Sequence, residues 1–209
     1  MTPSRLVGLA VAVGGMLALG GCISLFPKPV QLYRFDPDTS PAASAPASGL
    51  ISVRESPIDF VSGGAGDKIM TVRGDEIAYI ADARWDVPAE RLFQGSVEQA
   101  FDTSGGPVRL VEPGQASEAQ DRLALEVTRF EVDYGAAGAT PEVVVSLRAT
   151  LTREADLAFI GSQEFDITEP ASEDRVGPIV EAFKAATGKA VQGMTSWVEQ
   201  TAGKPPAAS

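Results

Sequence analysis

The sequence contains no histidine and a single cysteine, and these two shortages exclude most familiar catalytic and zinc-binding chemistry. Without histidine, neither a Ser-His-Asp triad nor a Cys-His pair can form, and the usual zinc ligand sets are missing. Carboxylate chemistry, a Ser-Lys pair or a metal held by oxygen ligands remain, but the acidic residues form no recognisable constellation. We therefore expect a binding protein that is not an enzyme and that carries no cofactor and no metal.

Positive charge is also scarce. The chain has 17 basic and 28 acidic residues, which gives a formal net charge of −11. An acidic surface is repelled by the phosphates of nucleic acids and by anionic lipid head groups. We therefore expect no nucleic-acid partner and no flat adsorption of the folded part on a membrane.

Long hydrophobic runs are absent except near the N-terminus, where an uncharged apolar stretch, Leu6–Leu19, follows Arg5. It is shorter than the roughly 20 residues that a membrane-spanning helix needs, and it is typical of a secretory signal. The stretch ends in Leu19-Gly20-Gly21-Cys22, which resembles the bacterial lipobox. That resemblance implies cleavage before Cys22 and a diacylglycerol thioether on its sulfur.

Cys22 is thus the predicted lipid attachment site, and residues 1–21 are its predicted signal peptide. One acyl chain holds a protein only marginally at a membrane, whereas two or three hold it firmly. The alternative, a buried thiol within an ordinary secretory signal, suits the spacing less well. Because the only cysteine is consumed by acylation, no thiol remains for a disulfide and the core must be held by packing alone.

The chain after the signal is long enough for one domain with a complete core. We expect a tether over residues 22–31, a domain over 32–200 and a disordered tail over 201–209, with a loop rich in Pro, Ala and Ser between 36 and 49. Ser62–Lys68 is glycine-rich but lacks the spacing of a phosphate loop, so it is predicted to be a turn. Asp36-Pro37-Asp38 lacks the glycine and the glutamate of a calcium loop and is predicted to be an acidic turn.

The first half of the domain alternates short β-prone runs with turn residues. Gly74-Asp75 suits a tight hairpin, and Asp86 is placed to cap a helix that starts near Val87-Pro88 and ends by Ser104-Gly105-Gly106. The predicted strands of this half cover residues 32–35, 50–53, 69–72, 77–80 and 108–111.

The second half carries the clearest periodicity. Apolar residues at 143, 145, 147, 149 and 151 alternate with a second set, Val144, Ser146, Arg148, Thr150 and Thr152, which predicts a strand with one buried face. Residues 123–127 and 130–134 alternate in opposite phases, and a bulge near Thr128-Arg129 would reconcile them. A further strand closes at Pro170, and Ser172 is a predicted N-cap for a long helix that continues to Val198. The expected fold is α+β, a single domain with a mostly antiparallel sheet and two main helices packed on it.

A family resemblance rests on an ordered series of short motifs behind the lipobox. These are Tyr33-Arg34-Phe35, Ile69-Met70-Thr71-Val72-Arg73, Glu76-Ile77-Ala78-Tyr79, Ala83-Arg84-Trp85, Pro88 and Leu92. Together they resemble the ABC-type transport auxiliary lipoproteins, from about Tyr33 to the last helix. The resemblance implies a non-catalytic protein that accompanies an ABC permease, its ATPase and an MCE-domain lipid-binding protein. Such systems move phospholipid or other lipids between the two membranes of Gram-negative bacteria.

Tyr79, Arg84 and Trp85 within these motifs have two interpretations. Large aromatic residues beside the start of a helix are most often core anchors. The functional alternative is that they line a groove that contacts a partner protein or an acyl chain. Met194 and Trp197 on the last helix have the spacing of ordinary core residues.

The leading functional hypothesis is a lipid-anchored periplasmic adaptor or tether of an intermembrane lipid transporter. Ile23, rather than Asp, follows Cys22, and by resemblance to enterobacterial sorting this implies the outer membrane; anchoring in the inner membrane is the alternative. A second hypothesis is an envelope-assembly lipoprotein that activates a cell-wall synthase, although the tether is short for that role. A carboxylate-dependent hydrolase is the third and the weakest.

Overall fold

The computed structural model describes residues 29–35, 49–111, 118–136 and 138–205. The predicted signal peptide, Cys22 and the acidic turn at 36–38 lie outside the described residues. The elements, in chain order, are β1 (Gln31–Tyr33), β2 (Ile51–Glu55), β3 (Asp59–Phe60), β4 (Lys68–Arg73), β5 (Glu76–Trp85), α2 (Ala89–Ser104), β6 (Val108–Val111), β7 (Asp121–Asp133), β8 (Glu142–Arg153), β9 (Phe159–Pro170) and α3 (Val176–Thr201).

The strands form one mixed sheet that is built around β7. One edge of β7 pairs along its whole length with antiparallel β8, which in turn pairs with antiparallel β9. The other edge of β7 pairs in parallel with three shorter strands, β2, β3 and β4. The long pairings are antiparallel and the short ones are mostly parallel, so the predicted single α+β domain with a mostly antiparallel sheet is confirmed.

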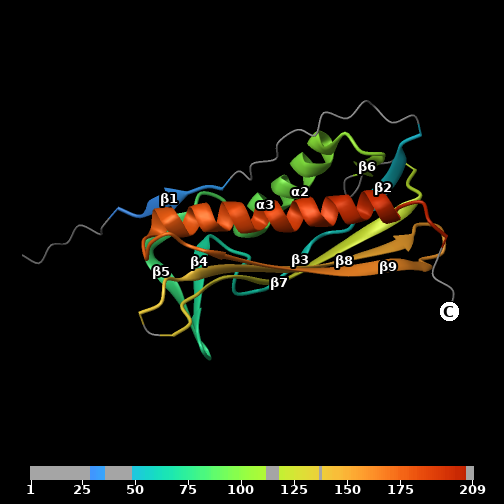
Figure 1. Ribbon diagram of the computed structural model, residues 1–209. Helices are drawn as coiled ribbons and strands as arrows, with labels where there is room; N and C mark the ends of the chain where they lie inside the picture. The colour runs from blue at the N-terminus through green and yellow to red at the C-terminus, as the bar shows by residue number, and fades with distance from the viewer. Residues whose placement is uncertain (1–28, 36–48, 112–117, 137, 206–209) are drawn as a thin grey trace, which may run out of the picture.

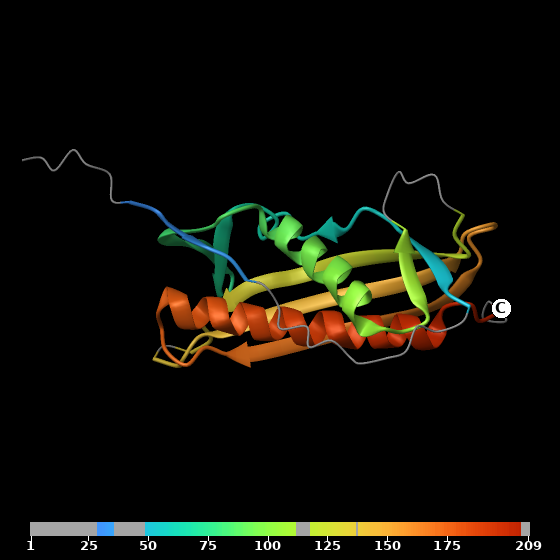
Figure 2. The same cartoon turned by 90° about the horizontal axis from the view of Figure 1, so that it is seen from above.

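Both helices lie on the same face of the sheet (Figures 1 and 2), with α3 running along β8 and β9 and α2 crossing beside it. On α2 the buried positions include Leu92, Phe93, Val97, Ala100 and Phe101, which fall on one helical face as predicted. Gly105 ends α2 in the left-handed conformation (φ 66°), which glycine adopts without a Cβ penalty.

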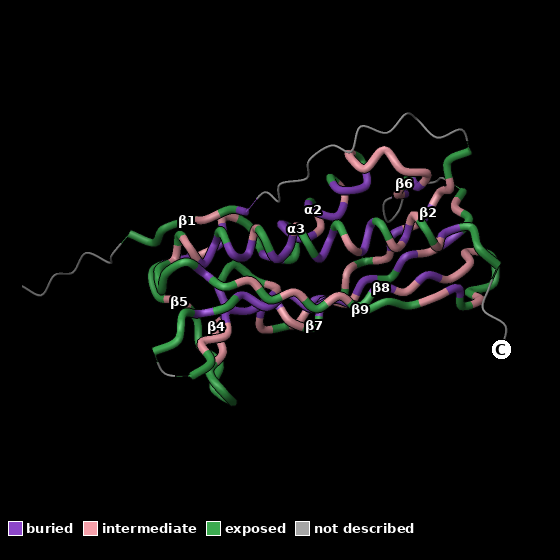
Figure 3. The backbone as a smooth tube through the Cα atoms, in the orientation of Figure 1, coloured by how far each residue is buried: buried purple, intermediate pink, exposed green. Residues whose placement is uncertain are grey.

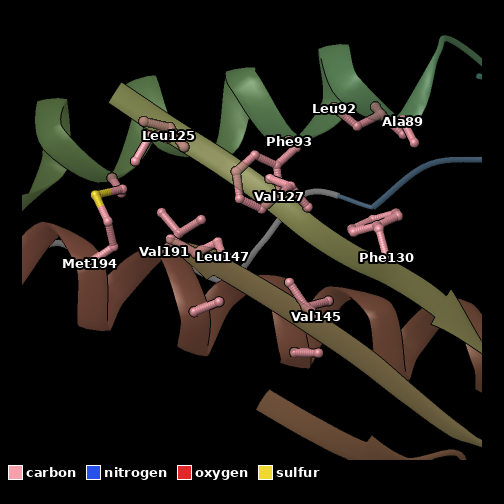
Figure 4. Packing of buried hydrophobic residues seen from close by; sticks show 14 of the residues in the cluster. Ala89, Leu92, Phe93, Leu125, Val127, Phe130, Val145, Leu147, Val191 and Met194 are labelled. Atoms are coloured by element: carbon pink, nitrogen blue, oxygen red, sulfur yellow. The ribbon is translucent and has the colours of Figure 1, made fainter. Parts of the chain in front are cut away.

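The predicted bulge in β7 is confirmed. The register with β8 shifts between Val127 and Arg129, so one additional residue is inserted there. Because side chains alternate between the two faces of a strand, this insertion returns Phe130 and Val132 to the face that carries Leu125 and Val127. All four side chains are buried under the helices. Figure 4 shows this core from close by, with Phe130 beside the residues of α2 and α3.

Phe130 is the centre of an aromatic cluster. Its ring lies 4.8 to 6.5 Å, between centroids, from five other rings. These rings come from the residues after β1, from β3 and β5, and from both helices; they belong to Phe35, Phe60, Trp85, Phe93 and Phe183. One side chain therefore joins the sheet to both helices.

The two predicted helix caps are wrong. Helix α2 begins after Pro88 without a side-chain cap, and the carboxylate of Asp86 instead accepts a hydrogen bond from Arg34. Helix α3 begins at Val176 rather than at Ser172, and its N-cap residue, Arg175, also provides no capping hydrogen bond. At the start of α2, the backbone N–H groups of Ala89 and Glu90 donate instead to the carbonyl oxygens of Gly66 and Ala65.

Several predicted boundaries also shift. Strand β1 starts at Gln31, inside the predicted tether, and ends before Phe35, which is nevertheless buried. The backbone N–H of Gly203 donates to Asp121, and Ala202 is buried, so residues 201–203 belong to the folded domain and not to a tail. In β8, the predicted open face is covered at its centre, where Val144 and Ser146 are buried.

No helix in the described part of the chain has the length and apolar character that crossing a bilayer requires.

Replacement of Phe130 by alanine tests whether this ring holds the layers together. We expect Phe130→Ala to lower the free energy of unfolding by about 3–5 kcal/mol, because it removes a buried ring and leaves a cavity. Urea unfolding followed by circular dichroism measures the loss. The matched control is Phe159→Ala on β9, whose side chain is 50% exposed and whose loss should cost about 1 kcal/mol or less. Equal costs for the two variants would refute the central role of Phe130.

Candidate interaction surface

The three residues that the sequence analysis selected, Tyr79, Arg84 and Trp85, all lie on β5 but in different environments. Trp85 is 2% exposed, and its ring packs edge-on against Phe35 and Phe183 at centroid distances of 5.1 and 5.2 Å. It is therefore a core anchor, and it cannot line a surface groove in this fold.

Tyr79 has the opposite placement. Its side chain is 42% exposed, so the interpretation of Tyr79 as a core anchor is wrong. The ammonium group of Lys68 lies 5.0 Å from the centre of its ring, and its hydroxyl donates a long hydrogen bond (3.4 Å) to the carbonyl oxygen of Gly63. The ring is held in place on the surface and is accessible to a partner.

Arg84 lies between these two cases. Its side chain is 38% exposed, and Nη1 donates to Oδ2 of Asp67 at 3.0 Å. Asp67 also accepts, through its backbone oxygen, the N–H of Trp85 at 2.8 Å. Arg84 thus fixes the glycine-rich turn to the end of β5, and its role in binding a partner stays a prediction.

The feature that separates Tyr79 from Trp85 is an irregularity in β5. The register between β4 and β5 shifts between Lys68 and Met70, and Asp82 adopts a positive φ of 57°, which is uncommon for a residue other than glycine. On one side of Asp82, the residues Ala83–Trp85 pair with β1 and lie over the core. On the other side, β4 and β5 form a hairpin that projects from the sheet, away from the helices (Figure 1).

We call residues 69–82 the projecting hairpin. Gly74-Asp75 forms its predicted two-residue turn between the paired residues Arg73 and Glu76. Most of β5 within it is exposed, as the green tube in Figure 3 shows. Ile77 is 65% exposed at its tip. A strand this apolar and this exposed is unusual on a monomeric surface and marks a candidate contact site.

One face of the projecting hairpin borders a cleft of about 430 Å³. Thr71, Ala78 and Ile80 line its hairpin side, and Tyr134 at the end of β7 lines the other. Arg73 lies over the ring of Tyr134 at 5.3 Å, and the hydroxyl of Tyr134 donates to Asp174 at 2.9 Å. Burial and this hydrogen bond raise the pKa of Tyr134 above its usual value, so the phenol stays protonated.

A second cavity, of about 380 Å³, lies between the segment after β2 and the first turn of α2. Glu55, which is buried, and Glu90 and Arg91 are among the residues that line it. Among the residues that the structure describes, no group of three or more His, Cys, Asp or Glu side chains is placed to hold a metal ion.

The strongest electrostatic feature lies at the opposite end of the sheet, where Glu154 accepts hydrogen bonds from two arginines. Arg122 donates to it at 2.8 and 3.0 Å, and Arg54 donates at 2.9 Å. The hydrogen bond from Arg122 is the main cause that holds the pKa of Glu154 below its ordinary value; partial burial opposes it, and Arg54 adds to it. This cluster joins β2, β7 and the turn after β8.

Comparison with known proteins identifies the family of this chain. Residues 33–194 match the family described as the ABC-type transport auxiliary lipoprotein component, which covers most of the chain. The chain belongs to this family. The resemblance that the sequence motifs suggested is therefore confirmed. Members of a lipoprotein family are anchored to a membrane of the cell envelope, and an auxiliary transport component has a non-catalytic role.

Solved structures share the fold of this auxiliary lipoprotein. Protein XCC0632 from Xanthomonas campestris, assigned to DUF330, is 22% identical over 81% of this chain and 95% of its own, with a TM-score of 0.72. The hypothetical protein CT253 from Chlamydia trachomatis is 12% identical over 73% of this chain and 98% of its own, with a TM-score of 0.51. No curated protein matches the chain.

The lowered pKa of Glu154 predicts how stability depends on pH. A carboxylate whose pKa is lowered by folding stabilises the protein above its unfolded pKa, about 4.3, and this contribution is lost as the pH falls through the folded value. Glu154→Gln should therefore be less stable than the unmodified protein at neutral pH, and the difference should shrink below about pH 4. Urea midpoints at a series of pH values measure this.

The control is Glu118→Gln. Glu118 is exposed and makes no ion pair in the described part of the chain, so the change should leave the urea midpoint nearly unaltered at each pH. A Glu154→Gln effect that stays constant down to pH 3 would contradict the electrostatic explanation.

Proposed function

We propose that this auxiliary lipoprotein is a non-catalytic adaptor of an ABC/MCE-type intermembrane lipid transporter, anchored through Cys22 at the periplasmic face of the outer membrane. The observation that carries the proposal is the family match over residues 33–194. The lipobox resemblance around Cys22 supports the anchor, and Ile23 behind it favours the outer membrane.

The position of the tether supports the adaptor role. Between Cys22 and Gln31, where β1 begins, a fully extended chain reaches about 30 Å at most. Strand β1 pairs directly with the base of β5. An acylated Cys22 would therefore keep the β1 end of the domain near the membrane while the rest of the domain extends into the periplasm.

The accessible chemistry supports binding over catalysis. The chain has no histidine, and its only cysteine is the proposed anchor. Tyr79 and Ile77 instead present apolar surface to a partner. In this function the partners are an ABC permease with its ATPase and an MCE-domain protein, and the transported molecule is a phospholipid or another lipid.

Metabolic labelling with an alkyne fatty acid tests the anchor. We expect the unmodified protein to be labelled and recovered in the membrane fraction. Cys22→Ala should carry no label, and the amount recovered in the membrane fraction should fall by at least about tenfold, because the protein then has no acyl chain to hold it at the membrane. Ser24→Ala, two residues away, is the control that keeps the label. An unlabelled unmodified protein would overturn the anchor.

Affinity purification of the unmodified protein from the membrane fraction, followed by mass spectrometry, tests which proteins are its partners. The adaptor role predicts that the permease, the ATPase and the MCE protein are recovered together. Recovery of a cell-wall synthase without transporter subunits would instead support the alternative role in envelope assembly. Turnover of glycan or ester substrates by the purified protein would contradict a non-catalytic function.

A further inference from the structure

The projecting hairpin leaves one edge of β5 without a neighbouring strand. Its inner edge pairs with β4 from Glu76 to Tyr79, and its outer edge pairs with β1 only at Ala83–Trp85. Within the described residues, no strand pairs with the outer edge between Glu76 and Asp82 (Figures 1 and 3). A row of backbone donors and acceptors is therefore open to another chain.

The hairpin geometry indicates which backbone groups face outward. The two-residue turn makes Arg73 and Glu76 the closing pair, which in such turns is hydrogen-bonded. Hydrogen-bonded and non-hydrogen-bonded pairs alternate along an antiparallel ladder. Ile77 and Tyr79 are in non-hydrogen-bonded pairs, so their N–H and C=O groups point away from β4 and toward the open edge.

The side chains beside this edge are apolar. Ile77 and Tyr79 are exposed, and Tyr79, Ala78 and Ile80 are among the residues that line the 430 Å³ cleft. Among the described strands, β1, β6 and β9 also pair on one side only, and the longest of these, β9, has exposed Glu164 and Asp166 and ends at Pro170, which are usual protections against strand pairing. Residues 77–81 contain no charge and no proline.

The charges lie at the two ends of this apolar stretch. Asp75 and Glu76 are at the tip, Asp82 is at the base, and residues 74–82 contain no basic residue. None of these three carboxylates forms an ion pair within the described part of the chain, and the cations Lys68 and Arg73 of β4 lie over the rings of Tyr79 and Tyr134. The open edge is therefore apolar in its centre and negative at both ends.

We propose that the outer edge of β5, from Ile77 to Ala81, binds an extended segment of a protein partner by strand addition. The segment that fits has an uncharged apolar centre and a basic residue at each end. Its backbone would pair with Ile77 and Tyr79, and its alternate side chains would lie beside Tyr79 and in the cleft beside Ala78. The identification of the partner as a transporter subunit rests on the proposed adaptor function. A lipid surface fits less well, because the three carboxylates would face anionic head groups.

Hydrogen exchange with mass spectrometry tests this on the full-length protein in nanodiscs of phosphatidylcholine. The probe is a short synthetic peptide of alternating valine and threonine with a lysine at each end, and the matched control peptide has a glutamate at each end. We expect the lysine-ended peptide to slow exchange in residues 76–82 by about tenfold or more. The glutamate-ended peptide should bind at least about tenfold more weakly.

Two variants separate backbone pairing from side-chain contact. Ile77→Pro removes an outward N–H without breaking the ladder to β4, and it should weaken peptide binding by about tenfold or more. Ile77→Thr keeps that N–H and should weaken binding by about threefold or less. Thermal unfolding shows whether both variants fold. If Ile77→Pro does not fold, the triple variant Asp75→Asn, Glu76→Gln, Asp82→Asn tests the proposal instead. It should abolish the preference for the lysine-ended peptide. Asparagine is suitable at position 82 because it tolerates a positive φ.

Several results would overturn the proposal. The first two are equal binding of both peptides and no protection from exchange at residues 76–82. The third is protection without peptide in phosphatidylglycerol nanodiscs, which indicates a membrane surface. The fourth is protection without peptide at raised protein concentration, which indicates a second copy of the chain. If the peptides fail while transporter subunits are still recovered, the adaptor function stands and this edge is not its binding surface. If the peptides bind but no subunit is recovered, the edge is a binding surface and the adaptor function fails.

Discussion

The packing around Phe130 is the constraint on which the other features depend. Five rings from separate parts of the chain meet this one side chain, and aromatic pairs at these distances add about 0.5–1.5 kcal/mol each beyond the area they bury. The bulge between Val127 and Arg129 decides that Phe130 faces the helices. Without the inserted residue, Phe130 would point to the opposite face, and the core would lose its centre. A local irregularity in one strand therefore fixes the positions of both helices relative to the sheet.

The same cluster fixes the base of the projecting hairpin, whereas most of β5 nearer the tip is exposed. Trp85 is held in the cluster, its backbone N–H donates to Asp67, and the next N–H, of Asp86, donates to Tyr33 on β1. Between Asp82 and the tip, β5 keeps its pairing with β4, the hydrogen bond from Tyr79 to Gly63 and the contact of the partly buried Ile80 with the core. A rigid base with an exposed extension is well suited to a binding role, because little of the domain must be reorganised when the extension acquires a partner.

Sequence periodicity was sufficient for the features that depend on local alternation. The phase change across Thr128 predicted the bulge, and the helical spacing on α2 and α3 predicted their buried faces. The caps failed because Asp86 has a partner, Arg34, that is 52 positions away, and such pairing is not visible locally. The parallel pairing of β2, β3 and β4 with β7 was missed because strands this short carry no register information. The interpretation of Tyr79 as a core residue failed for a related reason. The positive φ of Asp82 turns the hairpin out of the sheet, and no pattern in the sequence predicts this φ.

The projecting hairpin lies close to the point where the proposed tether enters the domain. Strand β1 follows the proposed tether and pairs with the base of β5, so the end of the domain next to the proposed anchor and the exposed edge belong to the same side of the sheet. A membrane anchor at Cys22 would limit this side to within about 30 Å of the lipid surface. The acidic body is repelled by anionic head groups, which favours an orientation in which the tether, rather than the domain surface, makes the membrane contact. An edge held at that distance can meet a partner that approaches the same membrane, and this is the geometry that an adaptor requires.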